Sequence, residues 1–198
     1  IKYILKIAEF MGLDFHVEEG VLIPRGDTEI LVEETLKIID NDKEYNICDL
    51  CCGSGAIGIS IAHLRENTKV DLIDYYDVPE KVTKRNITKH HLASRATFIK
   101  SDLLNEVINQ EKKYDVLVSN PPYIKEEVID TLMDDVKKYE PHTALSGGED
   151  GLSLGQGPGA CGLWHDLLWG QGAGDPFRPC AVSGRPADQG RGKGAGNY

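Results

Sequence analysis

Short apolar runs alternate with longer amphipathic segments through the middle of the chain. The runs are rich in Ile, Val and Leu, and in the segments between them apolar positions recur every three or four residues. This pattern predicts strands at 45–50, 69–74, 96–100 and 114–119, and helices at 56–65, 79–92, 104–110 and 125–139. Strands that alternate with helices form a parallel sheet with right-handed crossovers, so the predicted fold class is α/β with a Rossmann-like sheet.

The part of the chain before this region predicts a β-hairpin and one more helix. Residues 9–17 and 21–23 are apolar and surround Glu18-Glu19-Gly20, where we expect the hairpin to turn. Asp27 precedes a periodic stretch and is expected to cap a helix that runs to about Ile39.

The amino-acid composition changes abruptly near Leu154. Residues 154–198 hold 12 of the 21 glycines, both tryptophans and no Ile, Glu, Thr or Met, and no hydrophobic period continues there. The composition is typical of a flexible Gly-rich tail, and its abrupt onset equally favours a frame-shifted or foreign segment. RNA binding by an Arg-Gly tail is disfavoured, because that pair occurs only once in it.

Composition and charge narrow the class of protein. With 198 residues, 40% of them hydrophobic, the chain suffices for one domain with a sizeable core. It has no apolar run near about 18 residues and no secretion signal, and it begins with Ile1, which indicates a fragment of a cytoplasmic protein without a membrane span. The net charge of −10 makes nucleic acid an unlikely partner, because phosphate contacts need Lys and Arg.

The five cysteines do not suggest a disulfide framework. Cys48 and Cys51 have the spacing of a metal or redox pair, but no second Cys or His pair nearby completes a zinc site. We therefore expect free thiols and no metal.

A glycine-rich turn follows the first predicted strand. The run from Gly53 to Gly58 (GSGAIG) fits G-x-G-x-x-G between a strand and a helix, and Asp74 ends the next strand about 20 residues after Gly55. The combination favours a nucleotide-type cofactor, with Gly53, Ser54 and Gly55 beside it and Asp74 on a ribose hydroxyl.

Two further carboxylates lie at predicted strand ends. Asp49, beside the glycine turn, would repel a pyrophosphate but suits the cationic methionine end of S-adenosylmethionine. Asp102 is placed where it could accept from an adenine amino group, and its position fits a helix cap equally well.

The fourth predicted strand ends in Ser119-Asn120-Pro121-Pro122-Tyr123. Proline cannot donate to a sheet, so this motif lies past the carboxyl end of the strand, where open α/β sheets bind ligands. The Asn120 oxygen and the Pro121 carbonyl can accept from an amide NH2 group, while Pro122 and Tyr123 can pack against a planar group. These residue types suit methylation of a planar nitrogen, which depends on orientation because the nitrogen lone pair is delocalised.

These motifs resemble the HemK-type protein-(glutamine N5) methyltransferases, which modify peptide chain release factors with S-adenosylmethionine. The resemblance covers about residues 7–153 and includes two further segments, residues 22–29 (LIPRGDTE) and residues 139–152 (YEPHTALSGGEDGL). It implies a glutamine substrate in a Gly-Gly-Gln segment of the release factor. It also implies cofactor contacts from the loop around Gly53 and Gly55, ribose contact by Asp74, adenine contact at Asp102, and contact with the glutamine amide by Asn120 and the Pro121 carbonyl. Asp49, Ser54, Pro122 and Tyr123 complete the list of expected site residues.

The resemblance also divides the chain. Residues 1–26 are similar to the linker hairpin of an N-terminal domain, residues 27–153 to part of the class I methyltransferase sheet, and residues 154–198 to no part of the family. Gly26 stands where the family usually has proline. Since the family sheet has seven strands and an antiparallel hairpin, we expect its closing strands to be missing or replaced. The strand at 114–119 would then lack its outer neighbour.

Two other functions remain open. The N-P-P-Y signature also occurs in DNA and RNA amino-group methyltransferases, which the acidic charge and the two flanking segments disfavour. A non-catalytic S-adenosylmethionine-binding remnant is the other alternative, since the closing strands are not found.

Overall fold

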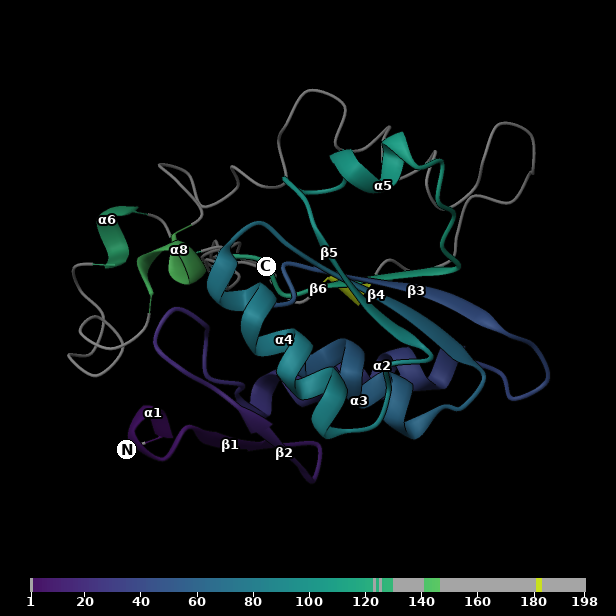
Figure 1. The fold of residues 1–198 in the computed structure, drawn as a ribbon, viewed down its shortest axis with the longest axis horizontal. Coiled ribbons are helices and arrows are strands. Elements are labelled where there is room, and N and C mark those ends of the chain that lie inside the picture. The colour runs from purple at the N-terminus through teal and green to yellow at the C-terminus, as the bar shows by residue number, and fades with distance from the viewer. Residues whose placement is uncertain (1, 123, 125, 130–140, 147–180, 183–198) are drawn as a thin grey trace, which may run out of the picture.

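The computed structural model describes residues 2–122, 124, 126–129, 141–146 and 181–182. Its centre is a parallel sheet in the order β5-β4-β3-β6-β7 (Figure 1). The strands are β3 (Tyr45–Leu50), β4 (Thr68–Asp74), β5 (Ala96–Lys100), β6 (Val116–Ser119) and β7 (Ala181–Val182). Helices α2 (Glu29–Ile38), α3 (Ala56–Leu64) and α4 (Asp77–Lys89) lie on one side of the sheet, and α5 (Asn105–Asn109) lies on the other. The expected α/β alternation from residue 45 to residue 119 is confirmed.

Strand β3 is the topological switch point of the sheet, where the order of the strands reverses. The chain adds β4 and β5 on one side of β3, then crosses back and adds β6 on the other side. Leu50, the last residue of β3, aligns with Ile73 of β4 and with Ser119 of β6. The carboxyl ends of these strands therefore form a crevice, the place where open α/β sheets hold ligands.

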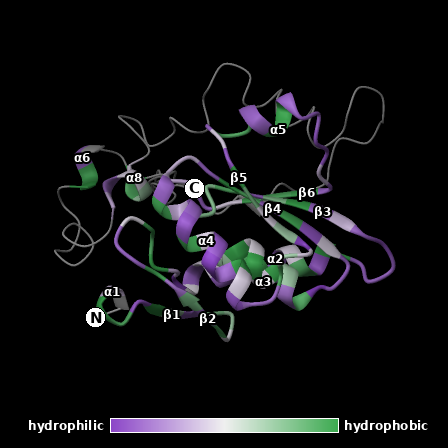
Figure 2. Ribbon diagram, in the orientation of Figure 1, coloured by the Kyte–Doolittle hydropathy of each residue, from purple (hydrophilic) through white to green (hydrophobic). Residues whose placement is uncertain are grey.

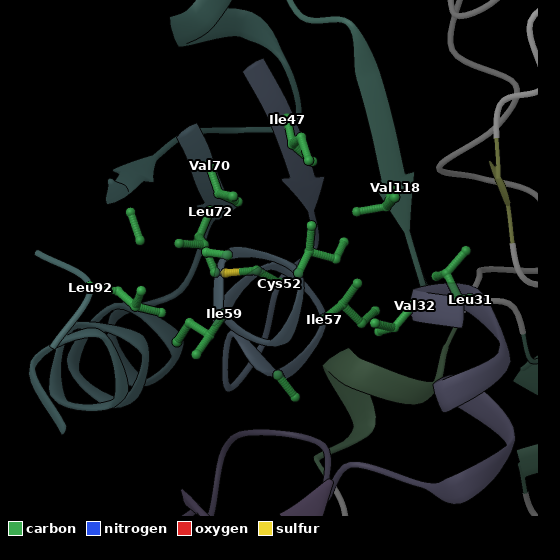
Figure 3. Close-up of a cluster of buried hydrophobic side chains, with 14 of the residues drawn as sticks. Leu31, Val32, Ile47, Cys52, Ile57, Ile59, Val70, Leu72, Leu92 and Val118 are labelled. Atoms are coloured by element: carbon green, nitrogen blue, oxygen red, sulfur yellow. The ribbon is translucent and has the colours of Figure 1, made fainter. Parts of the chain in front are cut away.

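The largest hydrophobic cluster lies between the sheet and α2, α3 and α4 (Figure 3). Helix α3 is apolar nearly all round in Figure 2, and seven of its residues, from Ala56 to Ala62, are buried. A helix without a polar face must be covered on every side, which holds α3 firmly in the core. A second cluster, with Cys48, Val107 and Leu117, packs on the face that α5 covers.

The hairpin does not turn where the sequence suggested. Strands β1 (Ile7–Phe10) and β2 (Leu13–His16) pair with Phe10 opposite Leu13. The loop is Met11-Gly12, and both residues have positive φ, 51° and 71°. Such a two-residue loop matches the twist of paired strands, so it decides the register. The expected turn at residues 18–20 exists, with Val21 N donating to Glu18 O over 3.3 Å, but it leads the chain toward the crevice instead of back along β2.

Asp27 does not cap the following helix, contrary to expectation. It lies inside a 3-10 turn, Gly26–Thr28, and Thr28 is the N-cap of α2 without a side-chain cap hydrogen bond. Within the turn, Thr28 N donates to Arg25 O and Glu29 N to Gly26 O. Backbone carbonyls therefore satisfy donors that a capping side chain would otherwise satisfy.

The outer edge of β6 is paired at its carboxyl end, over Val118 and Ser119, whereas we expected this strand to lack an outer neighbour. The two residues of β7 run parallel to it, with Val118 aligned to Ala181 and Ser119 to Val182. An open strand edge presents unpaired N–H and C=O groups and pairs readily with available chain. The remaining inferences about the tail at 154–198, and the helix expected at 125–139 beyond α6 (Glu126–Ile129), lie outside the described residues.

Two short helices complete the described part of the chain, α1 (Lys2–Leu5) and α8 (His142–Leu145). None of the helices in the described ranges is long and apolar enough to cross a membrane.

We predict that Gly58→Ala destabilises the fold by about 1 to 3 kcal/mol, because a Cβ in this buried helix would overpack the sheet. The added atom would lie 2.9 Å from Val70 Cγ1 and 3.0 Å from Asp49 Cβ. The matched control is Gly26→Ala, since a Cβ there meets no atom within 4 Å. Urea unfolding of both variants measures the effect, and equal midpoints would contradict the close packing of α3.

Candidate functional site

A cavity of about 490 Å³ opens at the carboxyl ends of the central strands. Its wall includes Leu50 at the end of β3, Asp74 at the end of β4, Ser101 after β5 and Asn120 after β6. The volume is in the range typical of sites for small ligands and cofactors. The cavity therefore occupies the crevice that the strand order creates.

The glycine loop between β3 and α3 forms one wall of this cavity. Gly53 and Gly55 have positive φ, 56° and 78°, which glycine adopts without strain. A Cβ on Gly55 would come within 3.1 Å of Ile59, Leu72 and Thr83. Gly53 and Ser54 line the cavity, while Gly55 is the N-cap of α3. Of the three predicted loop contacts, Gly55 thus serves the close packing behind the wall.

Asp74 holds the loop and faces the same cavity. Its Oδ2 accepts from Gly53 N at 2.9 Å, and its Oδ1 accepts from Tyr75 N at 2.8 Å and Tyr76 N at 3.3 Å. Desolvation raises the pKa of Asp74 despite these three donors. A carboxylate has about four acceptor sites, so Oδ2 can still accept a hydroxyl from a ligand.

Asp49 lies behind the cavity wall. It is fully buried, and its Oδ2 accepts from Gly58 N at 2.8 Å, while Oδ1 has no partner within the described structure. Burial raises the pKa of Asp49 to about 7, and the nearby charge of Asp74 adds to the effect. Asp49 is not among the residues that line the cavity, so in this structure it lies near the cavity without facing it, and its contact with a cofactor stays a prediction.

Asp102 is exposed and lines the cavity. The alternative reading as a helix cap is not supported, because Ser101 takes that place: its Oγ accepts from Glu106 N at 3.0 Å. The cap of α5 itself, Leu104, has no side-chain hydrogen bond. The Asp102 carboxylate is thus available to the cavity.

Asn120 and Pro122 line the cavity on the side of β6, and both are half-buried. The end of β6 is held on β3 by Ser119, whose Oγ donates to Leu50 O at 2.8 Å. Pro121 is also half-buried but is not a lining residue, and Tyr123 lies outside the described residues. Beyond the motif, Ile124 N donates to Leu145 O at 3.0 Å, which joins it to α8.

Several lining residues escaped the sequence analysis. Tyr75 and Tyr76 are 57% and 46% exposed, and their rings meet edge to face with centroids 5.2 Å apart. The sequence did contain a signal for them, because two aromatic residues directly follow the acid that is predicted to bind the ribose. Leu22, Pro24 and the residues from His142 to Ala144 also line the cavity, and they belong to the two segments that carried the family resemblance without an assigned role.

The three cysteines in the described ranges are free, as expected. Cys51 lines the cavity and has a positive φ of 58°. Burial raises the pKa of its thiol to about 12, so it is protonated at neutral pH. No group of three or more His, Cys, Asp or Glu residues in the described structure is arranged to hold a metal ion.

The sequence pattern of the methyltransferase small domain family matches residues 26–139. The chain belongs to this family. Its sheet is accordingly the Rossmann-like sheet of class I S-adenosylmethionine-dependent methyltransferases, as predicted.

Curated relatives of this methyltransferase domain act on glutamine, according to their names. The chain is 57% identical over 157 residues to the release factor glutamine methyltransferase of Clostridium botulinum, covering 79% of this chain and 56% of that protein. It is 52% identical to the enzyme of the same name from Clostridium acetobutylicum, covering 78% and 54%. It is 40% identical to the ribosomal protein uL3 glutamine methyltransferase of Francisella tularensis, covering 78% and 49%.

The chain therefore spans about half the length of the curated relatives it matches. Among solved structures, the N-terminal domain of human METTL16 in complex with SAH matches with a TM-score of 0.45 and 19% identity, covering 61% of this chain and 50% of that chain. Similarity at this level supports no functional argument.

We predict that Asp49→Asn removes a pH dependence of stability. The pKa of Asp49 is raised from 3.8 to about 7 in the folded protein, so the folded state binds the proton more tightly and loses this advantage as the pH rises from about 4 through about 7. Relative to the variant, the wild type should lose about 1.4 kcal/mol of unfolding free energy for each unit by which the pKa is raised. Urea unfolding at pH 5 and pH 8 measures this difference, and parallel pH profiles would contradict it.

Proposed function

We propose that the protein transfers a methyl group from S-adenosylmethionine to the side-chain amide nitrogen of a glutamine in peptide chain release factors. One observation carries the proposal: the glycine loop, Asp74 and Asn120 meet at one cavity, so a donor on the loop side would face the Asn120 side. The names of the relatives support glutamine as the acceptor.

The residues of the cavity fit S-adenosylmethionine. Gly53 allows close approach at the loop, and Asp74 Oδ2 can accept a ribose hydroxyl. Tyr75 and Tyr76 offer exposed rings for the adenine, and Asp102 offers an acceptor for its amino group. When bound, the donor supplies a methyl group on a positively charged sulfonium.

The electrostatics of the site favour this cationic donor over a dinucleotide. Desolvation raises the pKa of both Asp49 and Asp74, and the charge of Asp74 raises the pKa of Asp49 further. Adding a pyrophosphate would increase the repulsion, whereas a cation relieves it. A positively charged ligand therefore suits the two acids better than a pyrophosphate does.

The acceptor side must orient a weak nucleophile. In the proposed role, Asn120 Oδ1 accepts a hydrogen bond from one N–H group of the glutamine amide. The carbonyl of Pro121, which lies between the lining residues Asn120 and Pro122, accepts from the other, so that the nitrogen lone pair points at the donor. Pro122 lines the same wall and packs against the flat amide. Tyr123, outside the described residues, is proposed to complete this wall.

The choice of substrate protein is the finer part of the proposal. A release factor is favoured because the relatives with 57% and 52% identity carry that name. The proposed target within it is the glutamine of a Gly-Gly-Gln segment, which the family resemblance of the sequence implies. Ribosomal protein uL3 is the second candidate, since a relative with 40% identity is named for it. Both substrates belong to the translation machinery, so the proposal places the enzyme in the cytoplasm.

Methyl transfer from a labelled donor tests the proposal directly. A release factor, a Gly-Gly-Gln peptide, ribosomal protein uL3 and duplex DNA serve as acceptors in parallel. Label in the release factor that is lost when its glutamine is replaced supports the proposal. Label in uL3 alone would change the substrate, and label in DNA alone would change the class of enzyme. Binding of the donor without any transfer would identify a non-catalytic remnant.

We predict that Asp74→Ala weakens binding of S-adenosylmethionine by about 1.5 to 3 kcal/mol, the usual range for a hydrogen bond to a charged group. The control is Asp77→Ala, because the Asp77 side chain is 88% exposed and does not line the cavity. Isothermal titration calorimetry measures both, and an unchanged affinity in the Asp74 variant would remove that residue from the site.

We predict that Asn120→Ala lowers turnover on a release factor by about a hundredfold or more while donor affinity changes little. The reason is that Asn120 orients the accepting nitrogen and not the donor. Asn109→Ala, an exposed asparagine at the end of α5, is the matched control. Near-normal methylation by the Asn120 variant would refute its role.

A further inference from the structure

Asn86 is a fully buried asparagine in α4 that joins three distant parts of the chain. Its Oδ1 accepts from His16 N at 2.8 Å, and its Nδ2 donates to His16 O at 3.0 Å. The same Nδ2 donates to Ser54 O in the glycine loop at 2.9 Å. One side chain therefore links the hairpin, the glycine loop and α4.

The amide group of Asn86 is used completely in this arrangement. Asparagine has two N–H donors, and both go to backbone carbonyls, while its oxygen takes a backbone N–H. The orientation of the amide follows from these partners, because the flipped group would set an oxygen against two carbonyl oxygens. Replacing Asn86 would leave its buried backbone partners without a hydrogen bond, and each of them would then carry a desolvation cost.

The contact with Ser54 is one of two that α4 makes with successive carbonyls of the loop. Thr83, one helical turn before Asn86, donates from Oγ1 to Gly53 O at 2.9 Å. Gly53 and Ser54 both line the cavity. Helix α4 thus fixes the two loop residues that meet the ligand.

The hairpin has other attachments to α4 that do not reach the loop. Lys81 Nζ contacts Glu18 Oε1 at 2.6 Å, and Lys89 Nζ donates to Asp14 O at 2.5 Å. The Phe15 ring also packs on His90, with centroids 5.1 Å apart. Loss of Asn86 removes its two hydrogen bonds to His16 together with its bond to the loop, while the contacts of Lys89 with Asp14 and of His90 with Phe15 still hold the hairpin at the end of this helix.

We propose that Asn86 is a positioning residue that couples β2 to the cofactor site, which Phe10 of β1 already lines: it joins the backbone of His16 to the Ser54 carbonyl. This coupling rests on the proposed function in so far as the loop binds the methyl donor. It assigns the hairpin a role beyond linking or covering, because a change at β2 alters the geometry of the loop and a ligand at the loop stabilises β2.

Asn86→Leu tests the proposal, since leucine has a similar size and no hydrogen-bonding groups. The matched control is Asn67→Leu, because the Asn67 side chain also donates to two backbone carbonyls, Asp40 O at 2.7 Å and Lys43 O at 2.6 Å, away from the cavity. Both variants lose the hydrogen bonds of a buried or half-buried side-chain amide, so both are expected to unfold at a lower temperature than the wild type.

Calorimetry with S-adenosylhomocysteine, at a temperature where both variants are folded, separates stability from positioning. We expect the affinity to fall about tenfold in the Asn86 variant and to change less than about twofold in the Asn67 variant. In the absence of ligand, amide hydrogen exchange at residues 53–55 should be faster only in the Asn86 variant. Equal affinities and equal loop exchange would overturn the proposal.

The wild-type chain gives a second test that needs no variant. Saturating S-adenosylhomocysteine should slow exchange at the His16 amide as well as at residues 53–55, although His16 does not line the cavity. Protection of the loop alone would refute the coupling. Failure of the wild type to bind the ligand would instead refute the proposed function, and loop exchange in the Asn86 variant would still decide the positioning role.

Discussion

The close packing of α3 against the sheet is the constraint on which the rest of the site depends. Gly58 lets the helix approach so near that its N–H reaches the buried Asp49 carboxylate at 2.8 Å. This contact fixes where α3 begins, and with it the glycine loop that must turn through positive φ at Gly53 and Gly55. The cavity wall follows from that turn, since no room remains behind Gly55 for a side chain.

The packing also has an electrostatic consequence. Asp49 is buried with one oxygen unpartnered, and Asp74 is largely desolvated at the cavity wall, so both hold their protons more tightly than carboxylates in water. Two acids kept in this state, with no ion pair to either of them among the described residues, are costly in a fold that has only to be stable. Their arrangement is understandable if the proposed cationic donor completes the site, and it connects the core of the domain to its chemistry.

The N-P-P-Y side of the cavity is joined to the glycine-loop side through the sheet itself. Ser119 ties the end of β6 to Leu50 of β3, and Leu50 precedes the glycine loop by three residues of chain. The hairpin joins the same assembly from the opposite side through Asn86. Loop, acid and N-P-P-Y motif are thereby held by rigid elements, as the proposed reaction, which depends on orientation, would require.

Local sequence determined the alternating strands and helices, the glycine loop and the acidic and N-P-P-Y strand ends, because periodicity and glycine chemistry act over a few residues. The prediction of the hairpin turn was wrong, because the Met11-Gly12 turn forms only when β1 and β2 pair with each other. The prediction that Asp27 caps a helix was also wrong, because backbone carbonyls accept from the N–H groups that a capping side chain would otherwise bind. Only the tertiary structure decided that Asp49 lies behind the cavity wall and that Tyr75 and Tyr76 line the cavity. It also decided that Asn86 bonds to residues that precede it by 70 and by 32 positions in the chain. Such contacts depend on how elements distant in sequence pack together, which no short pattern of residues contains.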